Sequence, residues 1–289
     1  MKVDFHMHST FSDGTNSPTE MVQLTEVCDY CALTDHDEVG GCPEFVEAVN
    51  DSKTKRIAGA EFSIETSEGV DTFHLLGLGF RLDSVELQDF LIQQRALRDE
   101  RNVQMINKFK NLGFEVDAKG DSVYDIAGTG VLGRPHFAIW LIKHGYVKDF
   151  AEAFARYLAK DAPKKTSCYV ARRRSPQEDA IQVIHKAGGI AIMAHPRQLR
   201  RVWKKSKVDF DFFKGLLPPL IEKGLDGVEA IYSDNSPQEN ERFTQIANDF
   251  HLLKTAGSDY HGTFKPWRKI GMAVEDTFIN PFLEAVNLI

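Results

Sequence analysis

Short β-branched runs alternate along this chain with amphipathic helical stretches, and this alternation limits the folds open to it. Seven runs have the length and composition of strands: 2–6, 30–34, 56–61, 72–80, 190–194, 227–232 and 252–258. Strand–helix alternation with short connections favours a parallel sheet covered by helices, wound into a barrel or an open doubly wound sheet. No Gly-x-Gly-x-x-Gly follows the first run, which disfavours a dinucleotide-binding sheet.

Three predicted helices begin with the same pattern. Ser17, Ser175 and Ser236 are each followed directly by proline and, three residues on, by glutamate. A serine N-cap with proline at the first helical position and glutamate at the third forms a capping box, which fixes where a helix starts. We expect Gly188 and Gly189 to end the second of these helices just before a strand.

The strand pattern disappears between residues 84 and 175. A long charged helix is predicted there from apolar residues at helical spacing: Leu87, Leu91, Met105, Phe109 and Leu112. Gly113 should end this helix, and two shorter helical stretches follow at 134–144 and 149–158. We interpret residues 84–175 as a helical insertion that caps the active site, with residues 1–83 and 176–289 forming the main domain.

Length and charge narrow the class of protein. A chain of 289 residues suggests one large domain or one domain with a sizeable insertion. The net charge of −7 argues against indiscriminate polyanion binding, so no stable nucleic-acid complex is expected. No run approaches the roughly 18 apolar residues of a membrane span. The first residues lack the features of a signal peptide, so we expect a cytoplasmic location and no membrane partner.

The cysteines and the basic stretches have competing interpretations. Four cysteines give no disulfide framework, and Cys28-x-x-Cys31 lacks a second pair for zinc, so we predict Cys31 as a buried apolar residue. Residues 172–174 and 197–207 are locally basic. Each stretch is either a solvated face or a rim that attracts a phosphorylated substrate.

Potential metal ligands gather at the predicted strand ends. Histidines and carboxylates end or follow five of the seven predicted strands, and one lies inside the fourth: His6, His8, Asp35, His36, Glu61, His74, His195, Asp259 and His261. The carboxyl ends of parallel strands open onto one face, so residues from both ends of the chain should converge there. Histidine and carboxylate ligands with little thiolate suit Zn²⁺, Mn²⁺ or Fe²⁺.

The spacing of these residues favours more than one cation. His6 and His8 share one strand face because alternate residues of a strand point the same way. Glu61 could bridge two cations at the roughly 3.5–4 Å separation that clamps the attacking and leaving oxygens of a phosphoryl transfer. Asp35 alone could equally be a helix N-cap. The joint occurrence of so many ligand types therefore predicts a metal centre.

The motifs that carry these residues resemble those of the PHP family (polymerase and histidinol phosphatase). Four stretches match in the family's order: Asp4-Phe5-His6-Met7-His8-Ser9 with Ser12-Asp13-Gly14, Thr34-Asp35-His36-Asp37, Ala194-His195-Pro196, and Gly257-Ser258-Asp259-Tyr260-His261. The resemblance implies an α/β fold, a distorted seven-stranded (β/α) barrel, with two or three divalent metal ions (Mn, Zn or Fe).

The same resemblance implies a ligand set for each ion. The first site would use His6, His8, Glu61 and Asp259. The second would share Glu61 and add His74 and His195. The third would use Asp13, His36 and His261. All nine positions hold a residue type that can bind a metal.

The insertion resembles that of a stand-alone branch, which includes 3′,5′-nucleoside bisphosphate phosphatases and enzymes that trim short RNA from the 5′ end. The stretch Arg134-Pro135-His136 carries this likeness. It implies that Arg134 and His136 reach over the metals to hold a phosphate, although without it Arg134 could equally be a surface helix residue. Arg197, just after His195, is a further candidate phosphate ligand.

The expected activity is hydrolysis of a phosphomonoester, above all the 3′-phosphate of a nucleoside 3′,5′-bisphosphate, by a metal-bridging hydroxide. We expect His36 or His136 to protonate the leaving group and Asp35 to orient a ligand histidine. The expected partner is a small phosphorylated substrate, such as a nucleotide or the end of a short oligonucleotide. Alternatives are a 5′-to-3′ exonuclease on short RNA, a cyclic sugar-phosphate phosphodiesterase, a metal-dependent amidohydrolase and a non-catalytic binding module. An amidohydrolase commonly uses a bridging lysine that no predicted strand end offers here.

Overall fold

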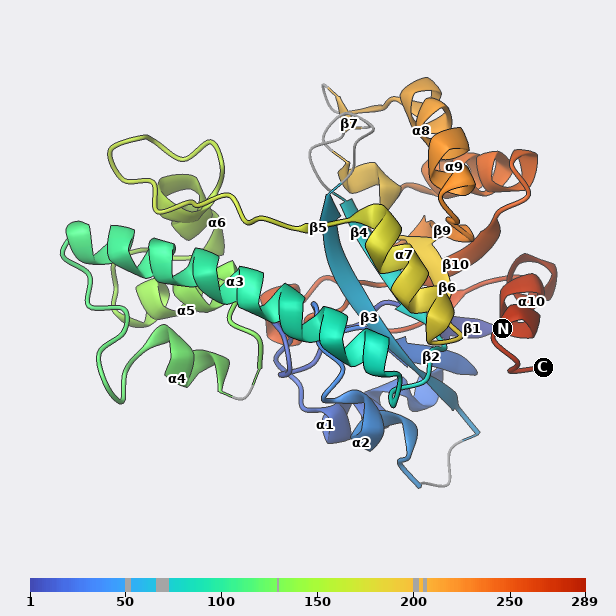
Figure 1. Ribbon diagram of the computed structural model, residues 1–289, viewed down its shortest axis with the longest axis horizontal. Helices are drawn as coiled ribbons and strands as arrows, with labels where there is room; N and C mark the ends of the chain where they lie inside the picture. Colours follow the sequence, from blue (N-terminus) through green and yellow to red (C-terminus); the bar gives the residue numbers. More distant parts are fainter. Residues whose placement is uncertain (50–52, 66–72, 129, 200–202, 205–206) are drawn as a thin grey trace.

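The computed structural model describes residues 1–49, 53–65, 73–128, 130–199, 203–204 and 207–289. Seven strands form a sheet curved into a barrel (Figure 1), in the order β10, β9, β6, β4, β3, β2, β1. Their bounds are β1 Lys2–Asp4, β2 Tyr30–Leu33, β3 Lys55–Glu65, β4 Phe73–Leu78, β6 Ile190–Met193, β9 Gly227–Tyr232 and β10 Leu253–Gly257. Two short strands pair at the margins, β5 Ser175–Pro176 with β3 and β11 Met272–Ala273 with β1.

The barrel closes between its first and last strands. The Phe5 amide donates to the Ala256 carbonyl at 3.0 Å, and the His8 amide donates to the Tyr260 carbonyl at 2.9 Å. These bonds bring the segment after β1 beside the segment after β10. The predicted distorted seven-stranded barrel is therefore confirmed.

The distortion comes from β4, which runs antiparallel to both of its neighbours, β3 and β6. A wholly parallel sheet was the wrong expectation for this strand. Only residues 66–72 separate β3 from β4, and a parallel crossover needs about a dozen or more. The pairing sets His74 opposite Ser63, so the beginning of β4 lies beside the carboxyl end of β3. Of the predicted strand 72–80, Thr72 lies outside the described residues.

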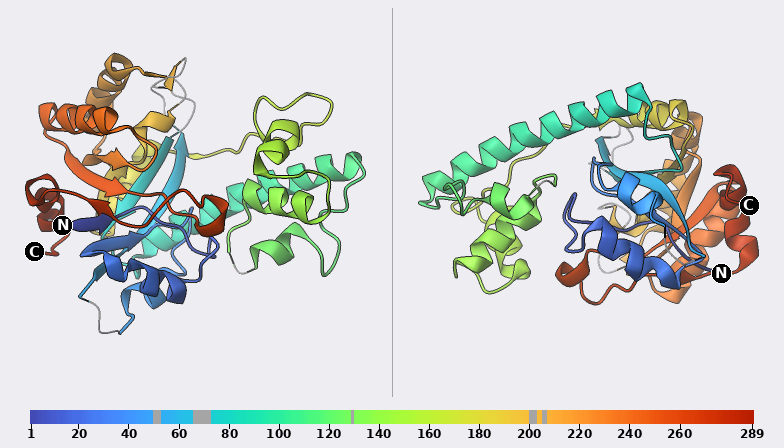
Figure 2. Two further views of the ribbon diagram at one scale, coloured as in Figure 1. Left: turned by 180° about the vertical axis from the view of Figure 1, so that it is seen from behind. Right: turned by 90° about the horizontal axis from the view of Figure 1, so that it is seen from below.

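Helices cover the outside of the barrel (Figures 1 and 2). Their bounds are α1 Pro18–Leu24, α2 Cys42–Val46, α7 Gln177–Lys186, α8 Phe210–Glu222, α9 Pro237–Asp249 and α10 Asp276–Ala285. Short elements join them: η1 Thr25–Val27, η3 Pro196–Gln198, β7 Trp203–Lys204, β8 Lys207–Val208 and η4 Gly262–Phe264.

Two of the three predicted helix starts are confirmed. Ser17 and Ser236 both form complete capping boxes. Ser175 does not cap α7, because its backbone pairs with Ile64 of β3 and its hydroxyl accepts a hydrogen bond from Gln94. The helix begins two residues later and has no side-chain cap.

The segment between β4 and β5 is helical and extends to one side of the barrel (Figure 2). It comprises α3 Val85–Asn111, α4 Val123–Ala127, α5 Arg134–Lys143, α6 Phe150–Ala153 and a π-helical turn, η2 Phe154–Leu158. Gly113, with a φ of +84°, follows α3 where its end was predicted. Buried side chains between positions 105 and 168 form a cluster apart from the barrel core.

All four cysteines are buried free thiols, as predicted for Cys31. Among the helices of the described residues, none is long and apolar enough to cross a membrane.

Candidate active site

Histidines and acids from both ends of the chain meet at one end of the barrel. In a first cluster, His6 Nε2 lies 3.4 Å from Glu61 Oε2 and 3.8 Å from Asp259 Oδ1. His8 Nε2 lies 3.3 Å from each of the same two oxygens. Ligands placed about 2.0–2.2 Å from a tetrahedral ion are about 3.3–3.6 Å apart. His6, His8 and Glu61 therefore place one atom each within reach of a shared cation, and Asp259 Oδ1 lies beside the two histidines.

These atoms lack ordinary partners. His6 Nε2, His8 Nε2 and Glu61 Oε2 are buried and make no hydrogen bond among the described residues. Buried polar atoms are almost always hydrogen-bonded, so several such atoms facing one another need an explanation. A divalent cation satisfies all of them together, and the donor set of imidazole and carboxylate fits such an ion.

Glu61 faces a second cluster with its other oxygen. Its Oε1 lies 2.6 Å from His74 Nδ1 and 2.9 Å from His195 Nε2. One carboxylate thus contacts ligand types on two sides, as a bridge between two ions would. Because β4 is antiparallel, His74 enters this cluster from the beginning of its strand rather than from the end.

A third cluster surrounds Asp13, which lies in the loop after β1. Its unpartnered Oδ1 is 3.3 Å from His261 Nε2, 3.7 Å from His36 Nε2 and 3.9 Å from His8 Nδ1. The other ring nitrogen of His36 is 2.8 Å from Glu61 Oε2, so His36 connects this cluster to Glu61, which borders both of the others. Seven of the nine predicted ligands fall into groups that could hold an ion, and His8 and His36 each belong to two such groups. The other two, His195 and Asp259, lie beside them, at 2.9 Å from Glu61 and 3.3 Å from His8.

Glu229 of β9 orients two of these histidines. His6 Nδ1 lies 3.0 Å from Glu229 Oε1, and the His195 amide donates to Glu229 Oε2 at 2.7 Å. When the imidazole donates from Nδ1, its Nε2 lone pair is free to face the cluster. Sequence reasoning missed Glu229, although an acid inside the apolar run 227–232 was a usable signal.

Asp35 contacts the cluster indirectly, through Ser12. It accepts hydrogen bonds from the Ser9 amide (2.8 Å), the Ser9 hydroxyl (2.6 Å) and the Ser12 hydroxyl. Ser12 Oγ in turn lies 3.3 Å from His8 Nδ1. Asp35 therefore holds the loop and the ring of His8, rather than facing the cavity. Burial raises the pKa of Asp35 to about 6, against the hydrogen bonds from Ser12 and Ser9.

The backbone is strained where the clusters need it. His195 (φ +28°) and Asp259 (φ +51°) both lie in the left-handed region, which is costly for residues other than glycine. Asp259 Oδ2 accepts hydrogen bonds from Arg268 and, at 3.0 Å, from the Tyr232 hydroxyl. These bonds hold the carboxylate so that its Oδ1 faces His6 and His8.

Burial and neighbouring charges shift the pKa values of the residues in the clusters. Burial raises the pKa of Glu61, but His74, His36 and His6 outweigh it and hold that pKa well below its usual range. Burial lowers the pKa of His8 to about 4, with a further contribution from His261. Burial also lowers the pKa of His74 to about 4. Burial also lowers the pKa of His6, but Glu229 and Glu61 outweigh it and raise that pKa well above its usual value. The pKa of His36 is raised in the same way, against burial, by Glu61 and Asp13. A divalent cation binds only the neutral imidazole, so it would have to displace a proton from these two rings.

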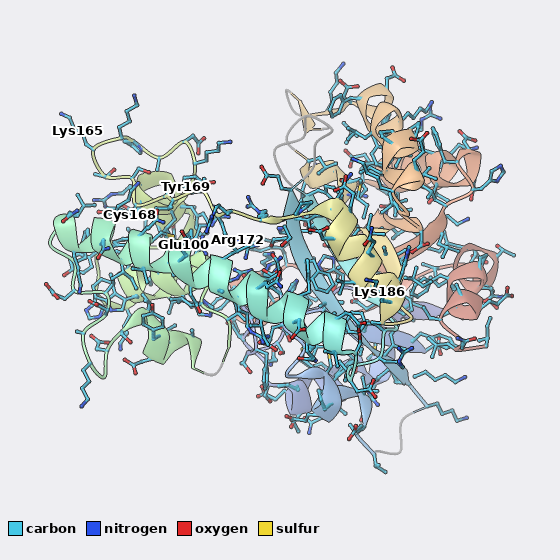
Figure 3. The ribbon with its side chains drawn as sticks, viewed as in Figure 1. Glu100, Lys165, Cys168, Tyr169, Arg172 and Lys186 are labelled. Carbon is cyan, nitrogen blue, oxygen red and sulfur yellow. The ribbon has the colours of Figure 1, made fainter. Side chains whose placement is uncertain are left out.

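A cavity of about 100 Å³ opens above the clusters. Asp13, His36 and His74 form part of its wall. The rest includes five arginines from the insertion and from the segment that leads to β5: Arg98, Arg101, Arg134, Arg172 and Arg174. Figure 3 labels Tyr169 and Arg172 along that segment.

Only part of this positive charge is neutralised by the protein. Arg98 and Arg172 both donate to Oδ2 of the buried Asp37, Arg172 at 2.8 Å. Arg101 is 7% exposed and has no ion pair or hydrogen bond among the described residues. Burial, together with the neighbouring arginines, lowers its pKa to about 8. A buried guanidinium without a partner is costly, and an anion in the cavity would offset that cost.

The predicted phosphate ligands differ in where they lie. Arg134 lines the cavity between the rings of Phe154 and Tyr169, with its guanidinium 5.6 and 5.7 Å from the ring centres. His136 is buried and its Nδ1 accepts the Gly133 amide at 2.9 Å, so it is bound to the start of its own helix. His136 is not among the residues that form the cavity wall.

Arg197 is also not part of the cavity wall, and its Nε donates to Glu239 of α9 at 3.3 Å. The basic stretch 172–174 is mixed, because Arg172 is buried in the cavity wall whereas Arg173 is exposed and paired with Glu100. In the stretch 197–207, residues 200–202 and 205–206 lie outside the described residues. Sequence reasoning missed Arg98 and Arg101, which have the spacing of an ordinary solvated helix face.

Two known proteins are similar in sequence to nearly the whole chain. A 5′-3′ exoribonuclease of Haemophilus influenzae is 32% identical over 269 residues, covering 90% of each chain. A 3′,5′-nucleoside bisphosphate phosphatase of Chromobacterium violaceum is 31% identical over 281 residues, covering 93% of this chain and 90% of that one.

Two solved structures superpose on nearly the whole chain. An amidohydrolase from C. violaceum, solved with bound sulfate and no metal, superposes with a TM-score of 0.82 at 28% identity, covering 99% of this chain and 97% of that one. A protein of Bifidobacterium adolescentis described as a metal-dependent phosphoesterase gives 0.79 at 27% identity, covering 98% and 96%.

The fold and the site together define a metal-dependent phosphoesterase. The PHP domain model matches residues 4–95, and the chain belongs to the PHP family.

Proposed function

We propose that the chain removes the 3′-phosphate of a nucleoside 3′,5′-bisphosphate. The observation that supports this substrate is the shared wall of one cavity, where His36 and His74 of the clusters lie beside five arginines. A single phosphoryl group at the clusters would leave Arg101 without a counter-ion, because Asp37 pairs only with Arg98 and Arg172 among these arginines of the described residues. A second phosphate on the same substrate supplies one, because guanidinium groups pair bidentately with phosphate oxygens.

In this proposal the three clusters hold two or three divalent ions (Mn, Zn or Fe). His6, His8, Glu61 and Asp259 would hold the first ion, and Glu61, His74 and His195 the second. Asp13, His36 and His261 would hold the third. Bound ions would activate water and neutralise charge on the phosphoryl oxygens.

The residues of the chain have distinct proposed roles. Arg101 and Arg134 bind phosphate oxygens, and the insertion 84–175 acts as a cap that keeps water out of the cavity. His36, whose Nε2 faces Asp13 and whose ring lines the cavity, donates a proton to the leaving alkoxide when the third ion is absent. Asp35 and His136 position the loop after β1 and the start of α5.

The second candidate is release of nucleotides from the 5′ end of a short RNA. Two observations favour it: the similarity to the H. influenzae exoribonuclease, and the exposed Lys164 and Lys165 on the chain segment that leads into the cavity wall at Tyr169. These lysines could contact phosphates further along an oligonucleotide. A cyclic sugar phosphate has fewer anionic oxygens to pair with the arginines, so we rank it lower.

A matched pair of substrates tests the proposal. We would compare phosphate release by Mn²⁺-loaded protein from adenosine 3′,5′-bisphosphate and from adenosine 3′-monophosphate, which lacks only the 5′-phosphate. One charge-assisted contact is worth about 1.5–3 kcal/mol, so kcat/KM should differ by about tenfold or more. A 5′-phosphorylated pentaribonucleotide forms the third arm, with release of nucleoside 5′-monophosphates as the readout for the second candidate.

Two variants make the test specific. Glu61→Gln removes a charge from the bridging position and should abolish turnover, whereas Glu241→Gln, exposed on α9, should not. Equal rates on the two adenosine substrates would refute the role given to the arginines. Turnover that survives in Glu61→Gln, or in the presence of a chelator, would refute the metal centre.

A further inference from the structure

Lys265, in the loop after η4, reaches into the third cluster. Its ammonium lies 3.3 Å from His261 Nε2 and 3.4 Å from Asp259 Oδ2. No motif in the sequence singled out this residue. It is the nearest lysine to the proposed ligands among the contacts of the described residues.

The lone pair that Lys265 contacts is the one a metal would need. His261 Nδ1 lies 2.8 Å from the Asp259 carbonyl, to which it can only donate. The ring therefore carries its lone pair on Nε2, which faces Asp13 Oδ1 at 3.3 Å on one side and Lys265 on the other. The lone pair of His261 Nε2 can accept a proton from the Lys265 ammonium or bind a metal ion. It cannot do both at once.

The surroundings allow Lys265 to leave. Asp259 Oδ2 keeps its bonds to Arg268 and to the Tyr232 hydroxyl when the lysine departs. Arg268 is buried, whereas the Lys265 side chain is 29% exposed and can reach solvent. Release of Lys265 therefore exposes His261 Nε2 without leaving the carboxylate unpaired.

We propose that Lys265 is an internal competitor of the third metal ion, and this rests on the metal centre proposed above. With Lys265 on His261 the chain holds two ions, and with Lys265 released it holds three. The third ion must displace a charge-assisted hydrogen bond and overcome repulsion from the ammonium. Its site is consequently the weakest of the three, and the free metal concentration sets how far it is filled.

Metal binding at equilibrium tests this proposal without reference to turnover. Wild-type protein and Lys265→Met would be dialysed against a series of free Mn²⁺ concentrations, and bound metal measured by mass spectrometry. Methionine keeps the length of the side chain but removes the charge and the donor. Loss of one charge-assisted hydrogen bond should tighten the weakest site by about tenfold.

Two further variants isolate the cause. Lys269→Met removes a nearby lysine that donates to the Pro266 carbonyl and, among the described residues, to none of the proposed ligands, so the weakest site should keep its wild-type affinity. Adding His261→Ala to Lys265→Met should cancel the gain, because the contested lone pair is gone. The proposal is overturned if Lys265→Met binds the weakest ion with unchanged or lower affinity, or if both proteins saturate at two ions. Activity is scored separately, so a wrong substrate leaves these results interpretable.

Discussion

Replacing Arg101 by methionine should stabilise the ligand-free protein while weakening its binding of phosphate. Arg101 is buried among four other arginines and has no ion pair or hydrogen bond among the described residues. A buried, unpaired guanidinium does not stabilise the fold, so we explain its position by the binding of an anionic ligand. Methionine fills a similar volume without a charge.

The magnitude follows from the position of the side chain. Burial and the neighbouring arginines lower the pKa of Arg101 from its usual range to about 8. At 1.36 kcal/mol per pKa unit this corresponds to an upper bound of about 6 kcal/mol. Relaxation and water reduce such penalties, and exchanging buried charges for apolar residues has stabilised proteins by about 1–4 kcal/mol. We expect a gain in that range, or several degrees in Tm.

Thermal and urea unfolding of metal-free protein in a phosphate-free buffer would measure this gain. Arg173→Met is the matched control, because Arg173 is exposed and the change should move stability by less than about 0.5 kcal/mol. Added phosphate should raise the Tm of the wild type more than that of Arg101→Met, since a ligand stabilises only the state that binds it. A destabilised Arg101→Met, or equal stabilisation of both proteins by phosphate, would refute the reasoning.

Two other substitutions test the groups around the site. Glu229→Gln should weaken metal affinity by about 10–100-fold, because the His6 ring loses its charged acceptor; metal titration of the variant measures this, and wild-type affinity would contradict it. Asp37→Asn should cost about 3–5 kcal/mol near pH 7, since Arg98 and Arg172 lose the carboxylate they share. Burial raises the pKa of Asp37, but Arg172 and Arg98 outweigh it and hold the pKa well below its usual range. Its contribution is therefore fully present above about pH 4 and is lost as the pH falls further, so urea unfolding should show the two proteins converging in acid. If the difference in the free energy of unfolding between the wild type and Asp37→Asn did not change with pH, the proposed role of the Asp37 carboxylate would be wrong.

The parts of the site that sequence reasoning located are those where chemistry restricts the residue type. His6, His8, Glu61 and Asp259 are all histidines or acids. His6, His8 and Asp259 follow the ends of β1 and β10, whereas Glu61 lies inside β3, which continues to Glu65 instead of ending at Glu61 as predicted. The capping boxes at Ser17 and Ser236 were equally legible, because a local pattern encodes a local structure.

The rest depended on tertiary contacts. Arg98 and Arg101 resemble any charged helix face until α3 is laid against the barrel. Ser175 carries a capping pattern, but pairing with β3 overrides it. The direction of β4 is set by a short connection rather than by composition, and it decides from which end His74 enters the site.

The contact between the segments that follow β1 and β10 also determines at which stage of folding the metal site forms. His6 and His8 follow the first strand, whereas Asp259 and His261 follow the last, and the backbone bonds between these segments close the barrel. A chain still emerging from the ribosome has three of the four proposed ligands of the first cation and lacks Asp259 until its final strand docks. The protein can therefore bind the first cation with all four ligands only after the barrel has closed. An ion bound by residues of both segments would in turn stabilise the contact between the first and last strands.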